Sequence, residues 1–216
     1  MALMATLIPK AKAAGLTLVL PEGMDPRVME AAAKIIQNGI AAKVIVLATP
    51  DEAKAALAKA GVCFCGLNIE ILNWLAAPAE LADKLADLFY QRRKAKGATP
   101  EDARKAIQNR LNFGNLMLNA GVVNGMVAGS IASTPDMLRA AYKAGVPLLC
   151  GSESGFTMVP YGEWHYREME VFVRYLGLTH LQAIQCGTQA GAFALKLKGQ
   201  TGEITPGCLA DIIIVD

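Results

Sequence analysis

Short apolar runs alternate with longer amphipathic segments over the first two thirds of the chain. Runs rich in Leu, Val and Ile, typical of buried strands, occupy residues 16–20 and 43–47, and a weaker one occupies 68–72. Between the first two runs, apolar side chains recur at helical spacing over residues 25–39. Strands that alternate with helices predict an α/β fold, in which a parallel sheet carries helices on both faces.

The predicted helices of this region begin with the same sequence pattern, a capping residue followed by proline at the first helical position. The pairs are Asp25–Pro26, Thr49–Pro50, Thr99–Pro100 and Thr134–Pro135. We further expect an amphipathic N-terminal helix that ends at Gly15, a long helix over 79–96, a helix over about 112–120 and a strand-like segment over 121–129.

The pattern changes near residues 140–146. Residues 146–150 are apolar on both faces, which predicts one more buried strand that extends the first sheet. A Gly-, Ser- and Pro-rich loop follows, and then a helix over 163–176, a helix that begins with the capping box Thr179–Gln182, and two short strands at 202–207 and 211–216. We therefore expect two domains, residues 1–145 and residues 146–216, the second a strand–helix–helix unit with a short β segment.

The charge distribution changes at the same point. Residues 1–146 contain 17 Lys and Arg against 12 Asp and Glu, whereas residues 147–216 contain 4 against 7. The whole chain carries a net charge of only +2, too small to indicate a nucleic-acid-binding protein. A secretory signal is not visible, and no apolar run reaches the about 18 residues of a membrane helix, so we expect a cytoplasmic protein without membrane contact.

The five cysteines are scattered and lie mostly in apolar runs. Cys63 and Cys65 lack the spacing of a common redox or zinc pair, and no histidine is near them in the sequence. The sequence therefore predicts five reduced, buried thiols.

Two features of the first part could bind an anion. Residues 129–134 lie between a strand and a helix start, where backbone N–H groups and the hydroxyls of Ser133 and Thr134 could receive phosphate. Asp136 in the same turn would oppose this, and Thr134 could serve only as a cap. The basic run over 92–96 could clamp an anionic substrate, or could be a solvated helix C-terminus.

The first part resembles the phosphotransacetylase (phosphate acetyl/butyryl transferase) family. The resemblance covers residues 1–143 and rests on LPEGMDPRVMEAA at 20–32, FYQRRKAKG at 89–97, NGMVAG at 124–129 and STPDMLR at 133–139. It implies a fold related to isocitrate dehydrogenase and the transfer of an acetyl group between coenzyme A and phosphate. Coenzyme A would be a substrate, and no separate cofactor is implied.

This resemblance also implies roles for individual residues. Arg93 and Arg139 match family arginines that bind anionic substrates such as phosphate or acetyl phosphate, a role suited to the guanidinium fork. Ser133 and Thr134 match the family's hydroxyl-rich turn. Ala132 and Asn124 replace a histidine and an aspartate of the family. The part of the family that holds its catalytic serine and aspartate and most of the coenzyme A pocket has no counterpart here, so we expect an incomplete active site.

The second part, over about residues 142–216, resembles the amidohydrolase superfamily. AGVPLLCGSESG at 144–155 is similar to its final barrel strand, and GEITPGCLADIIIVD at 202–216 to its closing segment. The resemblance implies a metal-binding role for Glu153, which stands where the family has aspartate. A hydrolytic metal centre needs about three protein ligands, and the chain has two histidines in all.

These observations leave three functional hypotheses. The favoured one is a phosphate acetyltransferase-like protein of doubtful activity that binds a small anionic substrate and could be a homo-oligomer. The alternatives are an inactive chimeric or structural protein and a remnant of a metal-dependent amidohydrolase.

Overall fold

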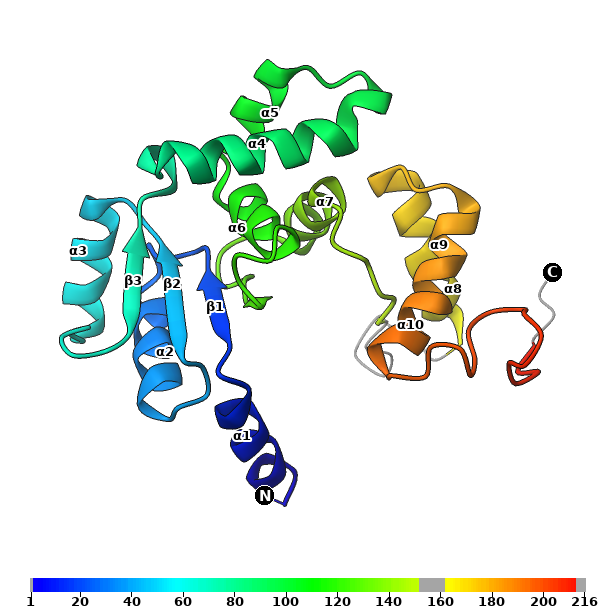
Figure 1. The fold of residues 1–216 in the computed structure, drawn as a ribbon, viewed down its shortest axis with the longest axis horizontal. Helices are drawn as coiled ribbons and strands as arrows, with labels where there is room; N and C mark the ends of the chain where they lie inside the picture. The colour runs from blue at the N-terminus through cyan, green and yellow to red at the C-terminus, as the bar shows by residue number, and fades with distance from the viewer. Residues whose placement is uncertain (1, 152–161, 213–216) are drawn as a thin grey trace. The chain divides into compact units, whose positions relative to one another are not determined.

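The structure, a computed structural model, describes residues 2–151 and 162–212. Contacts within the chain divide it into two compact units, Met1–Val146 and Pro147–Asp216, and each unit is described by itself. Figure 1 shows the elements of both units. The first unit holds the sheet, and the second is helical among its described residues.

A parallel four-stranded sheet forms the centre of the first unit, with strand order β3-β2-β1-β4. Its strands are β1 (Thr17–Leu20), β2 (Lys43–Leu47), β3 (Ile69–Leu72) and β4 (Gly125–Met126). The predicted parallel α/β sheet is confirmed. β4 covers only two residues of the predicted segment 121–129.

Seven helices are described in the first unit. They are α1 (Ala2–Ala14), α2 (Pro26–Gln37), α3 (Pro50–Ala60), α4 (Ala79–Arg93), α5 (Pro100–Ala106), α6 (Arg110–Asn119) and α7 (Thr134–Ala144). Short 3₁₀ turns cover Trp74–Ala76 and Lys94–Lys96. Proline occupies the first helical position of α2, α3 and α5, and their caps Asp25, Thr49 and Thr99 accept backbone N–H groups as predicted. For α7 the predicted cap, Thr134, is wrong: Ser133 is the cap, and Thr134 is the first helical residue.

Alternate residues of the strands enter two hydrophobic clusters on opposite faces of the sheet. Val19, Ile45 and Leu47 join the cluster built with α4, α5 and α6. Leu20, Val44 and Val46 join the cluster built with α2 and α3. Helices therefore cover both faces, as expected for a parallel sheet.

The loops that follow β1 and β4 leave the sheet side by side. The two strands pair in parallel, with Leu18 opposite Gly125 and Val19 opposite Met126, so their carboxyl ends lie at the same edge. The chain leaves β1 through α2 towards β2 on the other side, which makes the gap between β1 and β4 a topological switch point. Ligands of open α/β sheets commonly bind at such a point.

The second unit contains α8 (Glu163–Val171), a π-helical turn (Phe172–Leu176), α9 (His180–Gly187) and α10 (Gln189–Ala194). The predicted capping box at the start of α9 is confirmed. The Thr179 hydroxyl accepts the Gln182 backbone N–H, and the Gln182 side-chain oxygen accepts the Thr179 backbone N–H. Phe172, Leu178, Ala183 and other buried side chains form the interior of this unit.

The predicted strand over 146–150 is wrong. The Val146 N–H caps α7 by donating to Ala141, Pro147 has no N–H, and the Cys150 N–H donates to the Cys186 carbonyl, so this segment cannot supply a strand ladder. The predicted strand over 202–207 is also wrong, and residues 211 and 212 are not in a strand. The rest of the segment 211–216 lies outside the described residues.

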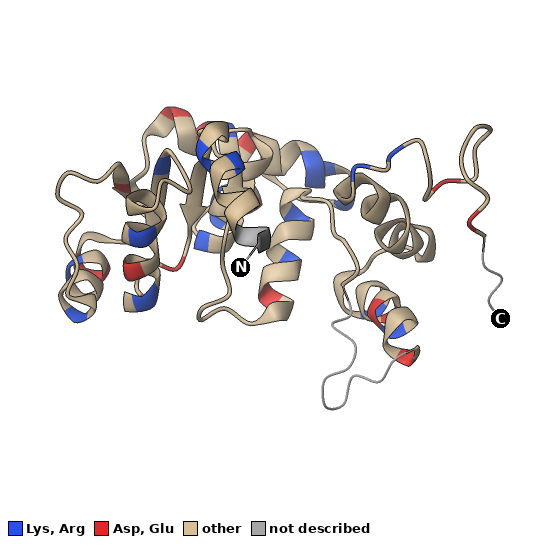
Figure 2. Cartoon of the chain, turned by 90° about the horizontal axis from the view of Figure 1, so that it is seen from below, with Lys and Arg blue, Asp and Glu red and all other residues tan. Residues whose placement is uncertain are grey.

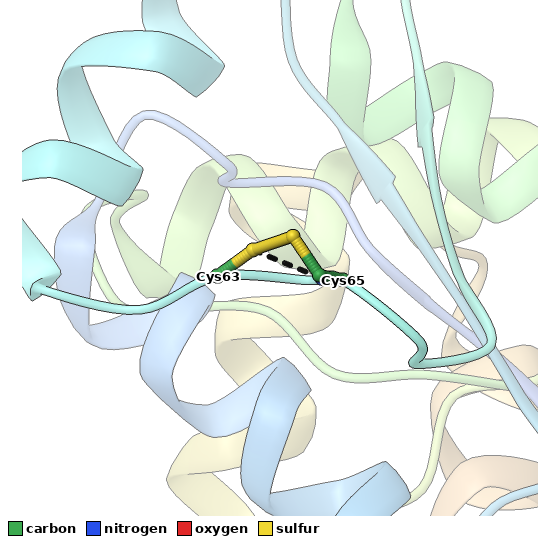
Figure 3. The surroundings of a disulfide bond; sticks show 2 residues. All are labelled: Cys63 and Cys65. Atoms are coloured by element: carbon green, nitrogen blue, oxygen red, sulfur yellow. Dashed lines mark hydrogen bonds between the residues drawn. A yellow bond between two sulfur atoms is a disulfide. The ribbon is translucent and has the colours of Figure 1, made fainter.

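The prediction of five reduced, buried thiols holds in full only for Cys186. Cys63 and Cys65 form a disulfide on an exposed loop between α3 and β3 (Figure 3). Cys186 is a buried free thiol, and Cys150 and Cys208 are free and half-buried.

Candidate anion-binding site

The carboxylate of Glu22, which follows β1, accepts four backbone N–H groups from the loop that follows β4. The donor–acceptor distances are 2.6 Å from Gly129, 2.9 Å from Ser130, 2.8 Å from Ile131 and 2.6 Å from Ala132. Each carboxylate oxygen receives two of these bonds. Glu22 thereby ties together the two loops at the switch point of the sheet.

The chain itself fills the turn that the sequence proposed as an anion receptor. Glu22 is 2% exposed, and burial by itself raises the pKa of a carboxyl group. The four N–H groups outweigh this effect and hold the pKa of Glu22 below its ordinary value of 4.5. The N–H groups of residues 129–132 are therefore not free for phosphate, which corrects that part of the prediction.

A second carboxylate strengthens the same junction. The Arg27 guanidinium donates two hydrogen bonds to Asp25 Oδ2, from Nε at 2.9 Å and from Nη2 at 2.6 Å. Arg27 Nη2 also donates to the Ser130 carbonyl at 2.9 Å. Mainly because of Arg27, the pKa of Asp25 falls to about 2. A charge-assisted pair of this kind fixes the orientation of both side chains.

Three of the four predicted substrate-binding residues lie on or beside the first turns of α7. The Ser133 hydroxyl caps the helix, accepting the Asp136 N–H and donating to Asp136 Oδ2 at 2.6 Å. Arg139 donates to Asp136 Oδ1 at 3.2 Å, and both side chains of this pair are half-exposed. Thr134, the first helical residue, is exposed.

The fourth predicted residue, Arg93, lines a cavity of about 500 Å³. Arg93 is the last residue of α4, and the walls come from the C-terminal end of α4, the turn after it, α5, the start of α6 and α7. Four lining side chains are basic: Arg93, Lys96, Lys105 and Lys143. The one acidic lining residue, Asp102, is engaged in the capping box of α5 with Thr99.

The basic side chains of the run over 92–96 have different partners. Arg92 donates to Asn119 at 2.8 Å and lies against Gly145, so it connects helices. Lys96 contacts the hydroxyl and the ring of Tyr142. Among the residues that the structure describes, none forms a hydrogen bond or an ion pair with the Arg93 guanidinium, which leaves it available to an anion.

The structure brings Arg93 and Lys143 to one cavity, which Arg139, Ser133 and Thr134 do not line. Arg139 and Lys143 are four residues apart and therefore lie on the same face of the helix. Sequence reasoning missed Lys105 and Lys143 as cavity residues. Lys143 could have been predicted from its spacing of four residues from Arg139. Lys105 could not, because the sequence does not show that α5 packs against α4.

Another charged cluster lies near the carboxyl ends of β2 and β3, and it is occupied by its own partners. Arg110 forms an ion pair with Glu52 at 2.7 Å and stacks 4.2 Å from the ring centre of Trp74. Burial raises the pKa of Glu52, but Arg110 and the Thr49 N–H lower it by a larger amount. The pKa of Glu52 therefore lies below its ordinary value. This cluster stabilises the fold and leaves no charge for a ligand.

The proposed metal-binding residue, Glu153, lies outside the described residues. Within residues 2–151 and 162–212, no three His, Cys, Asp or Glu side chains are grouped so that they could hold a metal ion. Over the same residues, no helix has the length and apolar character needed to cross a membrane.

The known proteins that this chain resembles decide its family. The model of the family described as phosphate acetyl/butaryl transferase matches residues 2–148. The chain belongs to this family. The fold of β1–β4, the cavity with Arg93 and all of α7 fall within the matched residues.

Individual members of the family show how much of it this chain covers. The phosphate acetyltransferase of Thermoanaerobacterium thermosaccharolyticum is 37% identical over 146 residues, which are 66% of this chain and 42% of that protein. The phosphate acetyltransferase of Haemophilus influenzae is 35% identical over 129 residues, 60% of this chain and 17% of that protein. The chain thus spans about two fifths or less of the length of these relatives.

Two solved structures are similar to this chain. A phosphotransacetylase from Streptococcus pyogenes is similar with a TM-score of 0.59 and 32% identity, over 66% of this chain and 42% of that one. The EutD phosphotransacetylase from Staphylococcus aureus has a TM-score of 0.58 over 90% of this chain and 71% of that one. At 21% identity, the second likeness shows the fold alone.

Proposed function

We propose that this chain binds the phosphate-bearing substrate of an acyl transfer between coenzyme A and phosphate. The observation that carries the proposal is the cavity of about 500 Å³ with four basic side chains, one of them the unpaired Arg93. A fixed guanidinium charge with several donors suits phosphate oxygens. The cavity lies in the part of the chain that its family model matches.

The proposed substrates are phosphate or acetyl phosphate in this cavity, with coenzyme A as the second substrate and no further cofactor. Arg93 would contact the anion directly. Arg139, one helical turn before the lining residue Lys143, would reach the anion after exchanging Asp136 for the ligand. The Ser133 and Thr134 hydroxyls lie at the other end of α7, about 15 Å along the helix from Lys143, so they would contact another part of the substrates, outside this cavity. We place the protein in the cytoplasm, without nucleic-acid or membrane partners, and its assembly into a homo-oligomer stays a prediction.

An acetyl-transfer assay tests this proposal on the full chain. The protein would be mixed with acetyl phosphate and coenzyme A, and the acetyl thioester would be measured directly. Thioester formed in proportion to protein, and lost in Arg93→Ala, supports an active enzyme. If no thioester forms but phosphate still binds, the chain is an inactive member that keeps the anion site, as the structural alternative holds.

The remaining alternative concerns residues 146–216 as an amidohydrolase-like fragment with Glu153 as a metal ligand. We propose that this part forms no metal centre, because a hydrolytic site needs about three protein ligands and the chain has two histidines. Elemental analysis of the purified protein tests this. About one zinc, manganese or iron per chain, lost on Glu153→Ala, would contradict it.

A further inference from the structure

The disulfide between Cys63 and Cys65 lies on a surface loop that one aromatic residue anchors. Phe64 and Val62 pack against the hydrophobic cluster that α2 and α3 form with the sheet. Cys63 and Cys65, on either side of Phe64, are exposed, and their disulfide is drawn in Figure 3. Their Cα atoms are 5.4 Å apart, within the usual range for a disulfide. The anchored loop therefore holds two sulfurs close together in contact with solvent.

The free thiols of the second unit show the contrast. Burial raises the pKa of Cys150 to about 12, with the Glu168 charge acting in the same direction, and burial also raises the pKa of Cys186. Thiol–disulfide exchange requires a thiolate, so these two cysteines react poorly at neutral pH. Cys63 and Cys65 are the pair that small molecules can reach.

We propose that Cys63 and Cys65 form a thiol–disulfide exchange site for low-molecular-weight thiols of the glutathione class. An incoming thiolate attacks one sulfur, the intramolecular S–S bond breaks, and the other cysteine leaves as a thiolate that takes up a proton. A second thiolate then attacks the mixed disulfide. Two small thiols are oxidised to one small disulfide, and the protein disulfide is reduced to two thiols.

The loop geometry indicates which sulfur leaves. The Cys65 backbone N–H lies 3.1 Å from Cys63 Sγ and donates towards it. A donor of this kind stabilises negative charge on sulfur, so Cys63 is the better leaving group, and the transient mixed disulfide forms on Cys65. In the reverse direction, Cys63 attacks that mixed disulfide and restores the ring.

Exposure also decides how labile the disulfide is. Exposed disulfides are reduced more readily than buried structural ones. The loop precedes β3 and so lies at the amino end of the strands, whereas the loops after β1 and β4 leave from their carboxyl ends. Neither cysteine lines the basic cavity. The redox state of the pair should therefore leave phosphate binding unchanged, which makes this inference independent of the proposed function.

The test is an equilibration of the full chain in mixtures of reduced and oxidised glutathione at neutral pH, followed by acid quenching, alkylation and peptide mass spectrometry. We expect the peptide with both cysteines to pass from disulfide to dithiol within the accessible range of glutathione ratios. We expect Cys150 and Cys186 to stay reduced throughout, because they are poorly reactive.

Single variants distinguish an exchange pair from a passive crosslink. In Cys63→Ser the resolving thiol is missing, so oxidised glutathione should leave a stable adduct on Cys65 that wild type resolves. The control Cys208→Ser should behave like wild type. A pair that stays oxidised in excess reduced glutathione, or that stays reduced in excess oxidised glutathione, would overturn the proposal. So would a wild-type protein that keeps the adduct as stably as Cys63→Ser.

Discussion

Glu22 illustrates how one buried residue holds two loops of the first unit together. Four N–H groups converge on its carboxylate, and at 2% exposure water contributes little to its solvation. A buried charge is tolerated only when such hydrogen bonds replace its hydration. The internal carboxylate thus orders the loop that leads into Ser133 and α7, and it does so with the donors that could otherwise bind phosphate.

Replacing Glu22 with Gln should destabilise the first unit by about 2–4 kcal/mol, because one amide oxygen cannot accept all four N–H groups and the amide N–H₂ opposes two of them. Urea unfolding midpoints measure the loss. The matched control is Glu70→Gln, whose carboxylate forms a half-exposed ion pair with Lys43 and should cost no more than about 1 kcal/mol. Equal losses in both variants would contradict the assigned role.

The same carboxylates predict how stability depends on pH. The pKa of Asp25 is about 2 in the folded protein against an ordinary 3.8, and that of Glu22 lies below 4.5. Because both pKa values are lower in the folded protein than in the unfolded chain, ionisation of these groups stabilises the fold. This stabilisation is complete above about pH 5 and is lost as the pH falls towards 2. Unfolding midpoints at stepwise lower pH should decline over this window. The decline should be shallower in Glu22→Gln, and an unchanged slope would contradict the assignment.

At the scale of the elements, the α7 N-terminus combines a structural and a proposed binding role in Ser133. Ser133→Ala should cost about 1 kcal/mol through loss of the cap, whereas Ser133→Asn should retain the cap and the stability. If the hydroxyl contacts substrate, substrate binding weakens in both variants while stability falls only in the first. Binding that follows stability alone would limit Ser133 to the cap.

The segment 146–150 allows a second comparison of neighbouring residues. Leu148 is 8% exposed and Leu149 is 48% exposed. Leu148→Asp should therefore destabilise the protein by several kcal/mol, and Leu149→Asp by less than about 1 kcal/mol. Thermal unfolding of both variants measures the difference. Two equally large losses would indicate that the segment is buried on both sides, as a central strand would be.

Local signals made most of the first unit predictable. Capping residues followed by proline marked the starts of α2, α3 and α5, and burial on both faces of the sheet follows directly from continuous apolar runs such as 43–47. The error at 146–150 arose because an apolar run does not reveal whether its backbone has partners. Here Pro147 lacks a donor, and Cys150 bonds to Cys186, which is distant in sequence.

At the scale of the whole molecule, the site was predictable only in part. The family resemblance pointed to Arg93, Arg139 and the turn at Ser133, all within the family match. The substrate-binding roles of these residues, and the domain assignment of 146–216, stay predictions. The Glu22 contact and the cavity residue Lys105 depend on contacts between distant segments, which local spacing does not encode.

The proposed function requires that an anion binds at the basic cavity, and titration calorimetry of the full chain with phosphate tests this most directly. Arg93→Ala removes the unpaired guanidinium, and the control Lys54→Ala removes an exposed positive charge from α3, on the other face of the sheet.

We predict that wild type and Lys54→Ala bind phosphate with a dissociation constant on the order of 1 mM, about −4 kcal/mol. Arg93→Ala should bind roughly tenfold more weakly or worse, because a hydrogen bond to a charged group contributes about 1.5–3 kcal/mol. Phosphate binding that is undetectable in wild type, or equally strong in all three proteins, would contradict the account.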